Sequence, residues 1–215
     1  MREPVSALKE SIRFRFKTNQ ANGVIMYSRG TQNDYFAMQM RENRLLLNIN
    51  LGVYAVGHSL SVLFYVFSYM TFILLYLFPG SGLMTSLSVG SLLDDNIWHD
   101  VVYSRYKRDI VFSVDRVAIR SKVKGEFLRL DLNQHFYIGG TPNKQEGLMV
   151  NQNFTGCVEN LYINSTNLGH EMKVEREYSY SYTAQRYYSQ HILYSCIVSN
   201  LSYLIITGNF LVHSR

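Results

Sequence analysis

The chain has 215 residues, a formal net charge of +5 and two cysteines. This length suits one domain with a substantial core, and the positive charges are scattered rather than gathered in the kind of basic arm that binds nucleic acid. The cysteines lie outside any CxxC or Cys/His cluster, which excludes a sulfur-ligated zinc site.

Strand patterns begin near residue 10. Ile12, Phe14 and Phe16 alternate with basic residues, which is typical of a half-buried strand. Asn22-Gly23 then supplies a turn before an apolar run, so the sequence predicts a hairpin here. Further strands are predicted over residues 35–40, 45–51, 83–90, 98–106, 110–115, 127–132, 136–140 and 154–164. Short strands separated by turns predict an all-β sandwich or jelly roll, with no convincing helix.

Six segments, in this order, resemble a laminin G-like (LNS) domain, and most closely those of the neurexin IV and contactin-associated-protein group. They read FRFKTNQANGVIMYS, DYFAMQMRENRLLLNINLG, DDNIWHDVVYSR, FSVD, FYIGGTPN and FTGCVENLYINS. The resemblance implies a concanavalin A-like jelly-roll sandwich over residues 11–170. It also implies a non-catalytic module that binds adhesion proteins or matrix glycans on the extracellular face of the plasma membrane, at cell junctions.

A hydrophobic segment, residues 53–80, interrupts the strand pattern. Within it, residues 60–78 are long and apolar enough for a transmembrane helix. If residues 60–78 crossed a bilayer, the strands before and after them would lie on opposite sides of it. Each set would then be half of a sandwich, with an apolar face and open strand edges exposed to water. We therefore interpret the segment as an insertion into one sandwich, and the codons expected at its two ends fit a retained intron. The alternative is a single-pass membrane protein anchored by residues 60–78.

Both ends of the chain raise questions of organisation. The first ten residues have no apolar core of signal-peptide length, so we expect an extracellular domain to lie within a longer protein. Residues 174–215 carry no sandwich patterning, and Lys173-Val174 fits a second intron boundary. The sequence therefore predicts an irregular tail outside the domain.

The resemblance places Cys157 at the first cysteine of a terminal disulfide. The other cysteine, Cys196, lies in the irregular tail, so we expect the native partner to be absent and a Cys157–Cys196 bond not to form. Asn153 and Asn164 begin N-glycosylation sequons within the sandwich, and a third sequon begins at Asn200 in the tail.

The resemblance further implies a calcium site on the rim of the sandwich. Asp34 matches a carboxylate ligand, Leu51 and Arg129 match carbonyl ligands, and Asp131 matches a second carboxylate. Ca²⁺ prefers oxygen ligands, and a small number of carboxylates gives weak affinity. The alternative is that Asp34 caps a turn and that Asp131 is a solvated strand residue.

Other chemistry-bearing residues have structural explanations. His99 has no nucleophile with an orienting acid beside it in the sequence, and Trp98 is expected on the core face. Gly139-Gly140 lacks the rest of a phosphate-binding loop, and Asp94-Asp95 is expected in a solvated turn. The sequence predicts no enzyme, although concanavalin-type sandwiches also host glycosidases, which leaves a lectin-like hydrolase as a third function.

Overall fold

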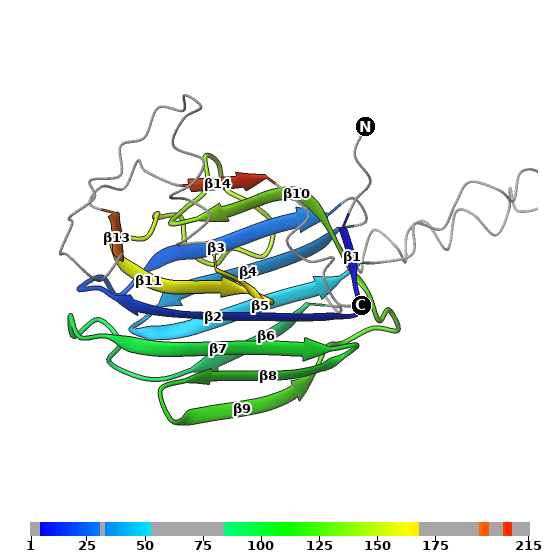
Figure 1. Cartoon of the computed structure of the whole chain (residues 1–215), viewed down its shortest axis with the longest axis horizontal. Helices are drawn as coiled ribbons and strands as arrows, with labels where there is room; N and C mark the ends of the chain where they lie inside the picture. Colours follow the sequence, from blue (N-terminus) through cyan, green and yellow to red (C-terminus); the bar gives the residue numbers. More distant parts are fainter. Residues whose placement is uncertain (1–4, 31–32, 53–83, 168–193, 198–203, 208–215) are drawn as a thin grey trace, which may run out of the picture.

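The computed structural model describes residues 5–30, 33–52, 84–167, 194–197 and 204–207. These residues form two seven-stranded antiparallel sheets packed face to face, as predicted, with no helix in these ranges (Figure 1).

Each sheet combines strands that are distant in the sequence. Sheet A has the order β1-β10-β3-β4-β5-β6, and β14 also pairs with β10. Its strands are β1 (Val5–Ala7), β3 (Gly23–Gly30), β4 (Asp34–Arg41), β5 (Arg44–Leu51), β6 (Thr85–Val89), β10 (Leu130–Ile138) and β14 (Leu204–Thr207). Sheet B has the order β12-β11-β2-β7-β8-β9, and β13 also pairs with β11. Its strands are β2 (Lys9–Lys17), β7 (His99–Tyr106), β8 (Asp109–Val114), β9 (Val117–Lys122), β11 (Gly156–Ile163), β12 (Thr166–Asn167) and β13 (Tyr194–Ile197).

The core lies between the sheets and follows from the period-two pattern. Phe14 and Phe16 on β2 are almost fully buried, as the alternation predicts. Phe36 on sheet A contacts Tyr103 on sheet B with ring centroids 5.1 Å apart, and it stacks on Phe136 of its own sheet. Each buried side chain of this size contributes roughly 1.5–3 kcal/mol, so this aromatic cluster is a large part of what joins the two sheets.

The hairpin predicted around Asn22-Gly23 is wrong. Strand β2 pairs with β7 and β11, whereas β3 pairs with β4 and β10, so residues 18–22 cross from sheet B to sheet A. A turn signal shows where a strand ends but not which strand it then pairs with. By contrast, the strands predicted over 35–40 and 45–51 do pair with each other as the hairpin β4–β5, and Glu42 and Asn43 at its turn both have positive φ.

Two further differences concern strands of sheets A and B. The strands predicted over 127–132 and 136–140 are one strand, β10, whose pairing with β3 shifts register between Leu132 and Phe136. Strand β9 was not predicted, because its residues are largely exposed and show little apolar alternation. It forms a hairpin with β8 at one edge of sheet B.

The strands on either side of the hydrophobic segment are neighbours. Strand β5 pairs with β6 in antiparallel register, with Ile49 opposite Thr85. The two parts of the chain therefore belong to one sandwich, as the sequence predicts. The segment itself, 53–80 with its 60–78 portion, lies outside the described residues. Within the described ranges there is no helix that is long and apolar enough to cross a membrane.

The C-terminal region differs from the expected irregular tail at two short segments. Strand β13 pairs with β11 in sheet B, and β14 pairs with β10 in sheet A. Both strands lie beside the sandwich in Figure 1, β13 next to β11 and β14 next to β10. The rest of the predicted tail lies outside the described residues.

Candidate metal-binding rim

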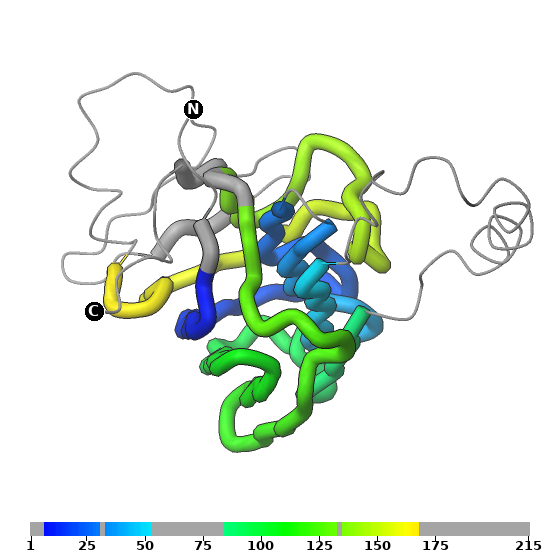
Figure 2. Tube along the Cα trace, turned by 90° about the vertical axis from the view of Figure 1, so that its right-hand side faces the viewer, coloured from blue at the N-terminus to red at the C-terminus, as the bar shows by residue number. Residues whose placement is uncertain are grey.

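The predicted calcium ligands meet at one end of sheet A. Strand β4 begins at Asp34, β5 ends at Leu51, and these two residues are directly paired. Asp131 follows the first residue of β10, and its backbone N–H donates to Asp34 Oδ2 at 2.7 Å. Arg129 lies two residues earlier, at the end of the β9–β10 connection. Figure 2 looks onto this end and shows that connection rising from sheet B to sheet A.

Two carboxylate oxygens at this rim lack a hydrogen-bond partner among the residues that the structure describes. Asp34 is 1% exposed, and its Oδ1 atom is buried without a hydrogen bond, as is Oδ1 of Asp131. Burial raises the pKa of Asp34 to about 6; the N–H of Asp131 lowers this pKa, while the Asp131 carboxylate raises it. Buried acceptors are normally satisfied. Carboxylate oxygens are the donor chemistry that Ca²⁺ prefers.

Gly30, the last residue of β3, makes this arrangement sterically possible. A Cβ atom at this position would lie 1.6 Å from the Asp131 carbonyl oxygen and 2.9 Å from Asp34 Cβ. Only a residue without a side chain lets β3 approach both aspartates so closely. No local pattern around Gly30 marks this role, because the residues that it contacts are distant along the chain.

The rim has few charges. Among the described residues, no group of three or more His, Cys, Asp or Glu side chains could hold a metal. A cation here would therefore use two carboxylates and complete its shell with backbone carbonyls and water. Such a shell predicts weak affinity of the extracellular type.

A buried ion pair that sequence reasoning missed lies behind the rim. The Arg105 guanidinium, 1% exposed, contacts both carboxylate oxygens of Glu10, and Tyr103 Oη donates to Glu10 Oε1 at 2.7 Å. Arg105 also donates to the carbonyls of Ala7 and Leu128, each at 2.9 Å. The pair therefore links β7 with β2 and anchors the connection that leads to Asp131.

The opposite end of the sandwich holds His99. Its Nδ1 atom lies 3.0 Å from Asp115 Oδ2, and its Nε2 atom lies 3.0 Å from Asp95 Oδ1. With both ring nitrogens engaged by carboxylates on two different loops, His99 joins these loops. Trp98 is not on the core face: its ring lies under the cations of Arg15 and Lys17, which project from the outer face of β2.

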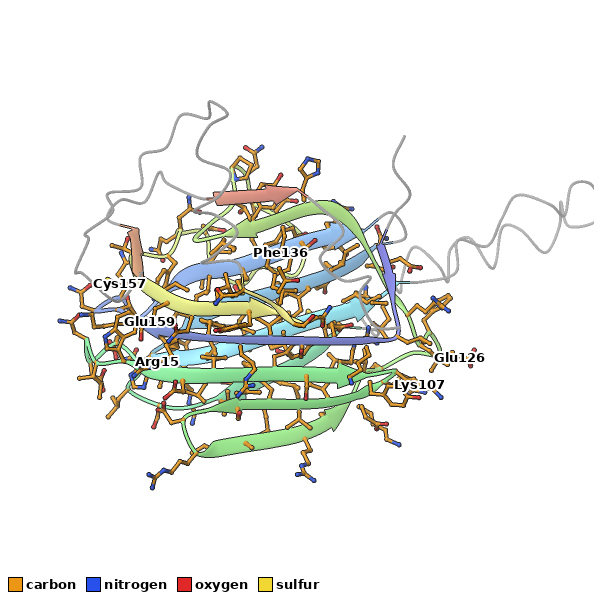
Figure 3. The ribbon with its side chains drawn as sticks, in the orientation of Figure 1. Arg15, Lys107, Glu126, Phe136, Cys157 and Glu159 are labelled. Atoms are coloured by element: carbon orange, nitrogen blue, oxygen red, sulfur yellow. The ribbon has the colours of Figure 1, made fainter. Side chains whose placement is uncertain are left out.

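Cys157 also lies at that end, near Arg15 and Glu159 and far from Lys107 and Glu126 (Figure 3). In contrast to the expectation of a missing partner, Cys157 is disulfide-bonded, and the β11–β13 register places Cys196 directly opposite it. The chain contains no third cysteine.

The two sequon asparagines within the sandwich differ in their surroundings. Asn153 Oδ1 accepts from the Thr141 N–H at 3.0 Å, and its side chain lies against Gly140. Asn164, with positive φ, forms the β11–β12 turn with the exposed Ser165, and its Oδ1 accepts from the Ser11 N–H at 2.9 Å. Both asparagine side chains are half-buried.

The sequence of this chain is similar to a known domain family and to two known proteins. The sequence profile of the Laminin G domain matches residues 16–166. Neurexin-4 of Drosophila melanogaster is 51% identical over 195 residues, which is 91% of this chain and 13% of that protein. Contactin-associated protein 1 of Mus musculus is 32% identical over 164 residues, which is 76% of this chain and 10% of that protein. The chain thus spans only a small part of these relatives.

Solved structures show the same fold. The LG1-3 region of the laminin alpha2 chain matches with a TM-score of 0.56 and 17% identity, over 74% of this chain and 27% of that one. Domains LG4-5 of the mouse laminin alpha1 chain match with a TM-score of 0.54 and 20% identity, over 76% of this chain and 40% of that one. At these identities the likeness concerns the fold.

Proposed function

Because the chain belongs to the laminin G domain family, a family of non-enzymatic modules, we propose that it is an extracellular recognition domain with one Ca²⁺ at the rim. Its partners would be cell-surface adhesion proteins or matrix glycans at cell junctions. The similarity to Neurexin-4 and contactin-associated protein 1 supports this proposal, and the chain spans a small part of the length of each relative. The observation that carries the calcium proposal is the pair of buried, unpartnered oxygens on Asp34 and Asp131.

The proposed shell uses oxygens from three strand ends. Asp34 and Asp131 supply carboxylates, and Leu51 and Arg129 supply backbone carbonyls. A bound Ca²⁺ would neutralise the Asp34 charge, whose burial is unfavourable, and would fix the ends of β4, β5 and β10 relative to one another. The loops at this end would then be ordered for a partner.

Calorimetric titration of the 215-residue chain with Ca²⁺ tests the site. We expect a dissociation constant of about 10⁻⁴ to 10⁻³ M for the wild type and no measurable binding for Asp34→Ala. Asp109→Ala is a matched control, because Asp109 also begins a strand but is exposed and lies 3.7 Å from Lys122 rather than among the proposed ligands. Equal heats from wild type and Asp34→Ala would refute the site.

The pKa of Asp34 predicts how calcium binding depends on pH. Since this pKa is raised to about 6, the carboxyl holds a proton below pH 6 that Ca²⁺ must displace. We expect the affinity to fall as pH decreases from 7 to 5, and the measured heat of binding to vary with the ionisation enthalpy of the buffer, because the released proton is taken up by the buffer. A pH-independent affinity over this range would remove Asp34 from the shell.

We propose that residues 11–52 and 81–170 form the domain and that residues 53–80 are an insertion. The β5–β6 pairing argues against a single membrane span over residues 60–78. Such a span would leave residue 78 on the far side of the bilayer, and the seven residues from 79 to 85 reach at most about 25 Å. A bilayer with its headgroups is about 40–45 Å thick, so Thr85 could not return to pair with Ile49.

Deleting residues 53–80 tests this organisation. We expect the shortened chain to keep a two-state thermal transition and the calcium response, and to associate less than the full chain, because an apolar run is removed. A deletion variant that fails to fold, while the full chain folds, would show that the segment belongs to the domain. Amplified transcript from the source tissue gives an independent measurement: a dominant message with codons 53–80 would contradict a retained intron.

A further inference from the structure

His99, the first residue of β7, is a buried titratable residue that the proposed function does not use. Its side chain is 7% exposed and lies between two carboxylates, with Nε2 3.0 Å from Asp95 Oδ1 and Nδ1 3.0 Å from Asp115 Oδ2. Asp95 belongs to the β6–β7 loop and Asp115 to the β8–β9 turn. The imidazole ring therefore contacts two separate connections at once.

The protonation state of the ring decides how many of these contacts are attractive. A neutral imidazole has one N–H donor and one acceptor, whereas the imidazolium has a donor on each nitrogen. Because an ionised carboxylate only accepts, a neutral His99 can donate to Asp95 or to Asp115, and the other carboxylate then faces a ring lone pair at 3.0 Å. The charged ring satisfies both sides, through two charge-assisted hydrogen bonds.

The other surroundings of His99 leave these two carboxylates as its charged contacts in the described part of the chain. Phe16 of β2 is paired with His99, and its uncharged ring lies 5.5 Å from the imidazole between centroids. Charged side chains of β2, β7 and β11 at this end are engaged elsewhere. These contacts join Arg15 to Asp100 at 3.0 Å, Arg15 to Glu159 at 2.7 Å and Lys17 to the Trp98 ring at 5.2 Å. A titration of His99 therefore acts directly on Asp95 and Asp115.

Both connections hold residues in a strained backbone conformation. Leu92 and Asn96 in the β6–β7 loop and Asp115 in the β8–β9 turn have φ angles of 54°, 63° and 53°, in the left-handed region. A bulky residue such as Leu92 rarely adopts this region, and such conformations persist where surrounding contacts impose them. The bonds to His99 are one such constraint, so the loss of one bond would let a connection relax.

Large apolar side chains are exposed on both connections. Leu92 and Ile97 in the β6–β7 loop are 70% and 58% exposed, and Val117, which follows the β8–β9 turn, is 59% exposed. Because His99 links the two backbones that carry these side chains, the charge on its ring affects how firmly they are held relative to one another.

We propose that His99 is a proton-controlled clasp between the β6–β7 loop and the β8–β9 turn, closed on both sides when the imidazole is charged and open on one side when it is neutral. Acidification supplies the second N–H and strengthens the link, whereas a rise in pH removes it. Imidazole is the side chain that ordinarily changes charge between pH 5 and 8. The clasp goes beyond the recognition function and uses no residue of the calcium rim.

Amide hydrogen exchange, measured by NMR on the 215-residue chain, tests the clasp. Two backbone N–H groups report on it, because Ile97 donates to Asp95 Oδ1 and Asp100 donates to Asp115 Oδ1, each at 2.9 Å. Their protection factors, which divide out the intrinsic pH dependence of exchange, should be about tenfold higher at pH 5.5 than at pH 8, as expected for one charge-assisted hydrogen bond. The parent protein for this test is Asp34→Asn without Ca²⁺, because Asp34 also titrates in this range.

Substitutions on either side of the contact give distinct predictions in this parent. Asp115→Asn keeps an acceptor for the Asp100 N–H and offers an amide N–H to the neutral ring, so protection should be higher at pH 8 than at pH 5.5, the reverse of the parent. Asparagine also tolerates the left-handed φ of this position. His99→Gln carries no titrating group and should show no pH response. His135→Gln, which removes an exposed imidazole from β10, is the matched control and should keep the response of the parent.

Two results would overturn the clasp. Equal protection at pH 5.5 and pH 8 in the parent would show that the charge on His99 does not control the contact. A response that persists in His99→Gln, or that keeps its sign in Asp115→Asn, would assign the effect to another group. The sign in Asp115→Asn decides the matter even where glutamine at position 99 disturbs folding, and no result of this test bears on calcium binding.

Discussion

Glu10 and Asp34 are both almost completely buried carboxylates, yet their surroundings are opposite. Glu10 receives Arg105 on both oxygens and Tyr103 on one. Asp34 receives one backbone N–H on Oδ2, while its Oδ1 is unpartnered and burial raises its pKa to about 6. The protein's own Arg105 therefore neutralises the Glu10 charge, whereas the Asp34 charge would need a bound cation.

This difference separates a structural pair from a candidate binding site. Removing a partner from a satisfied buried ion pair leaves an uncompensated charge and destabilises the protein. Removing the charge from an unsatisfied buried carboxylate should instead stabilise the unliganded protein and abolish the ligand response. Substitutions at the two sites should therefore change stability in opposite directions.

The largest effect is expected for Arg105→Met. This change leaves Glu10 charged and buried, so we expect a loss of about 3–5 kcal/mol in the free energy of unfolding. Denaturant titration measures the loss. The double variant Arg105→Met/Glu10→Gln removes the uncompensated charge and should recover part of it; a double variant as unstable as the single one would contradict the role of the ion pair.

A somewhat smaller loss is expected for Gly30→Ala. The added Cβ would overlap the Asp131 carbonyl oxygen, so β3 and β10 must separate, at a cost of about 1–3 kcal/mol or more. Thermal unfolding and calcium titration together measure the effect, because the separation also displaces Asp131 from Asp34. Arg29→Ala, an exposed neighbour on the same strand, is the control and should change neither quantity appreciably.

The opposite sign is expected for Asp34→Asn. Burial raises the pKa of Asp34 in the folded protein to about 6, from an ordinary value of 3.8. Between about pH 4 and pH 6 the unfolded chain has therefore already lost this proton while the folded protein still holds it. The free energy of unfolding of the wild type consequently falls as the pH rises through this range. At pH 7 without calcium, the variant should be more stable by about 2 kcal/mol.

Chemical denaturation at several pH values checks this prediction. The advantage of Asp34→Asn should vanish near pH 4, where the wild-type carboxyl is protonated in both states, and saturating Ca²⁺ at pH 7 should stabilise the wild type but not the variant. A variant that is less stable than the wild type at pH 7 without calcium would show that the Asp34 charge is already compensated.

The smallest effect is expected for Tyr103→Phe. The change removes the hydroxyl that donates to Glu10 Oε1 but leaves Arg105 on the same carboxylate. We expect a loss of about 1 kcal/mol in the free energy of unfolding. A loss as large as that of Arg105→Met would mean that the hydroxyl, rather than the guanidinium, neutralises Glu10.

The sequence predicted the candidate rim better than its supporting residues. Asp34, Leu51, Arg129 and Asp131 were identified from the family resemblance, and the structure brings the two aspartates into a direct hydrogen bond. Gly30 and Arg105 carried no local signal. Their importance comes from contacts with residues far along the chain, which no periodicity or spacing records.

Local patterning by itself determined the all-β class and most strand positions, because side chains alternate within a strand and turn residues mark its ends. Only the tertiary structure decided that β2 and β3 lie in different sheets, that β5 meets β6 across the hydrophobic segment, and that β13 brings Cys196 opposite Cys157. Strand pairing depends on which distant segments bury one another's apolar faces, so it is a property of the whole packed chain and not of any short part of it.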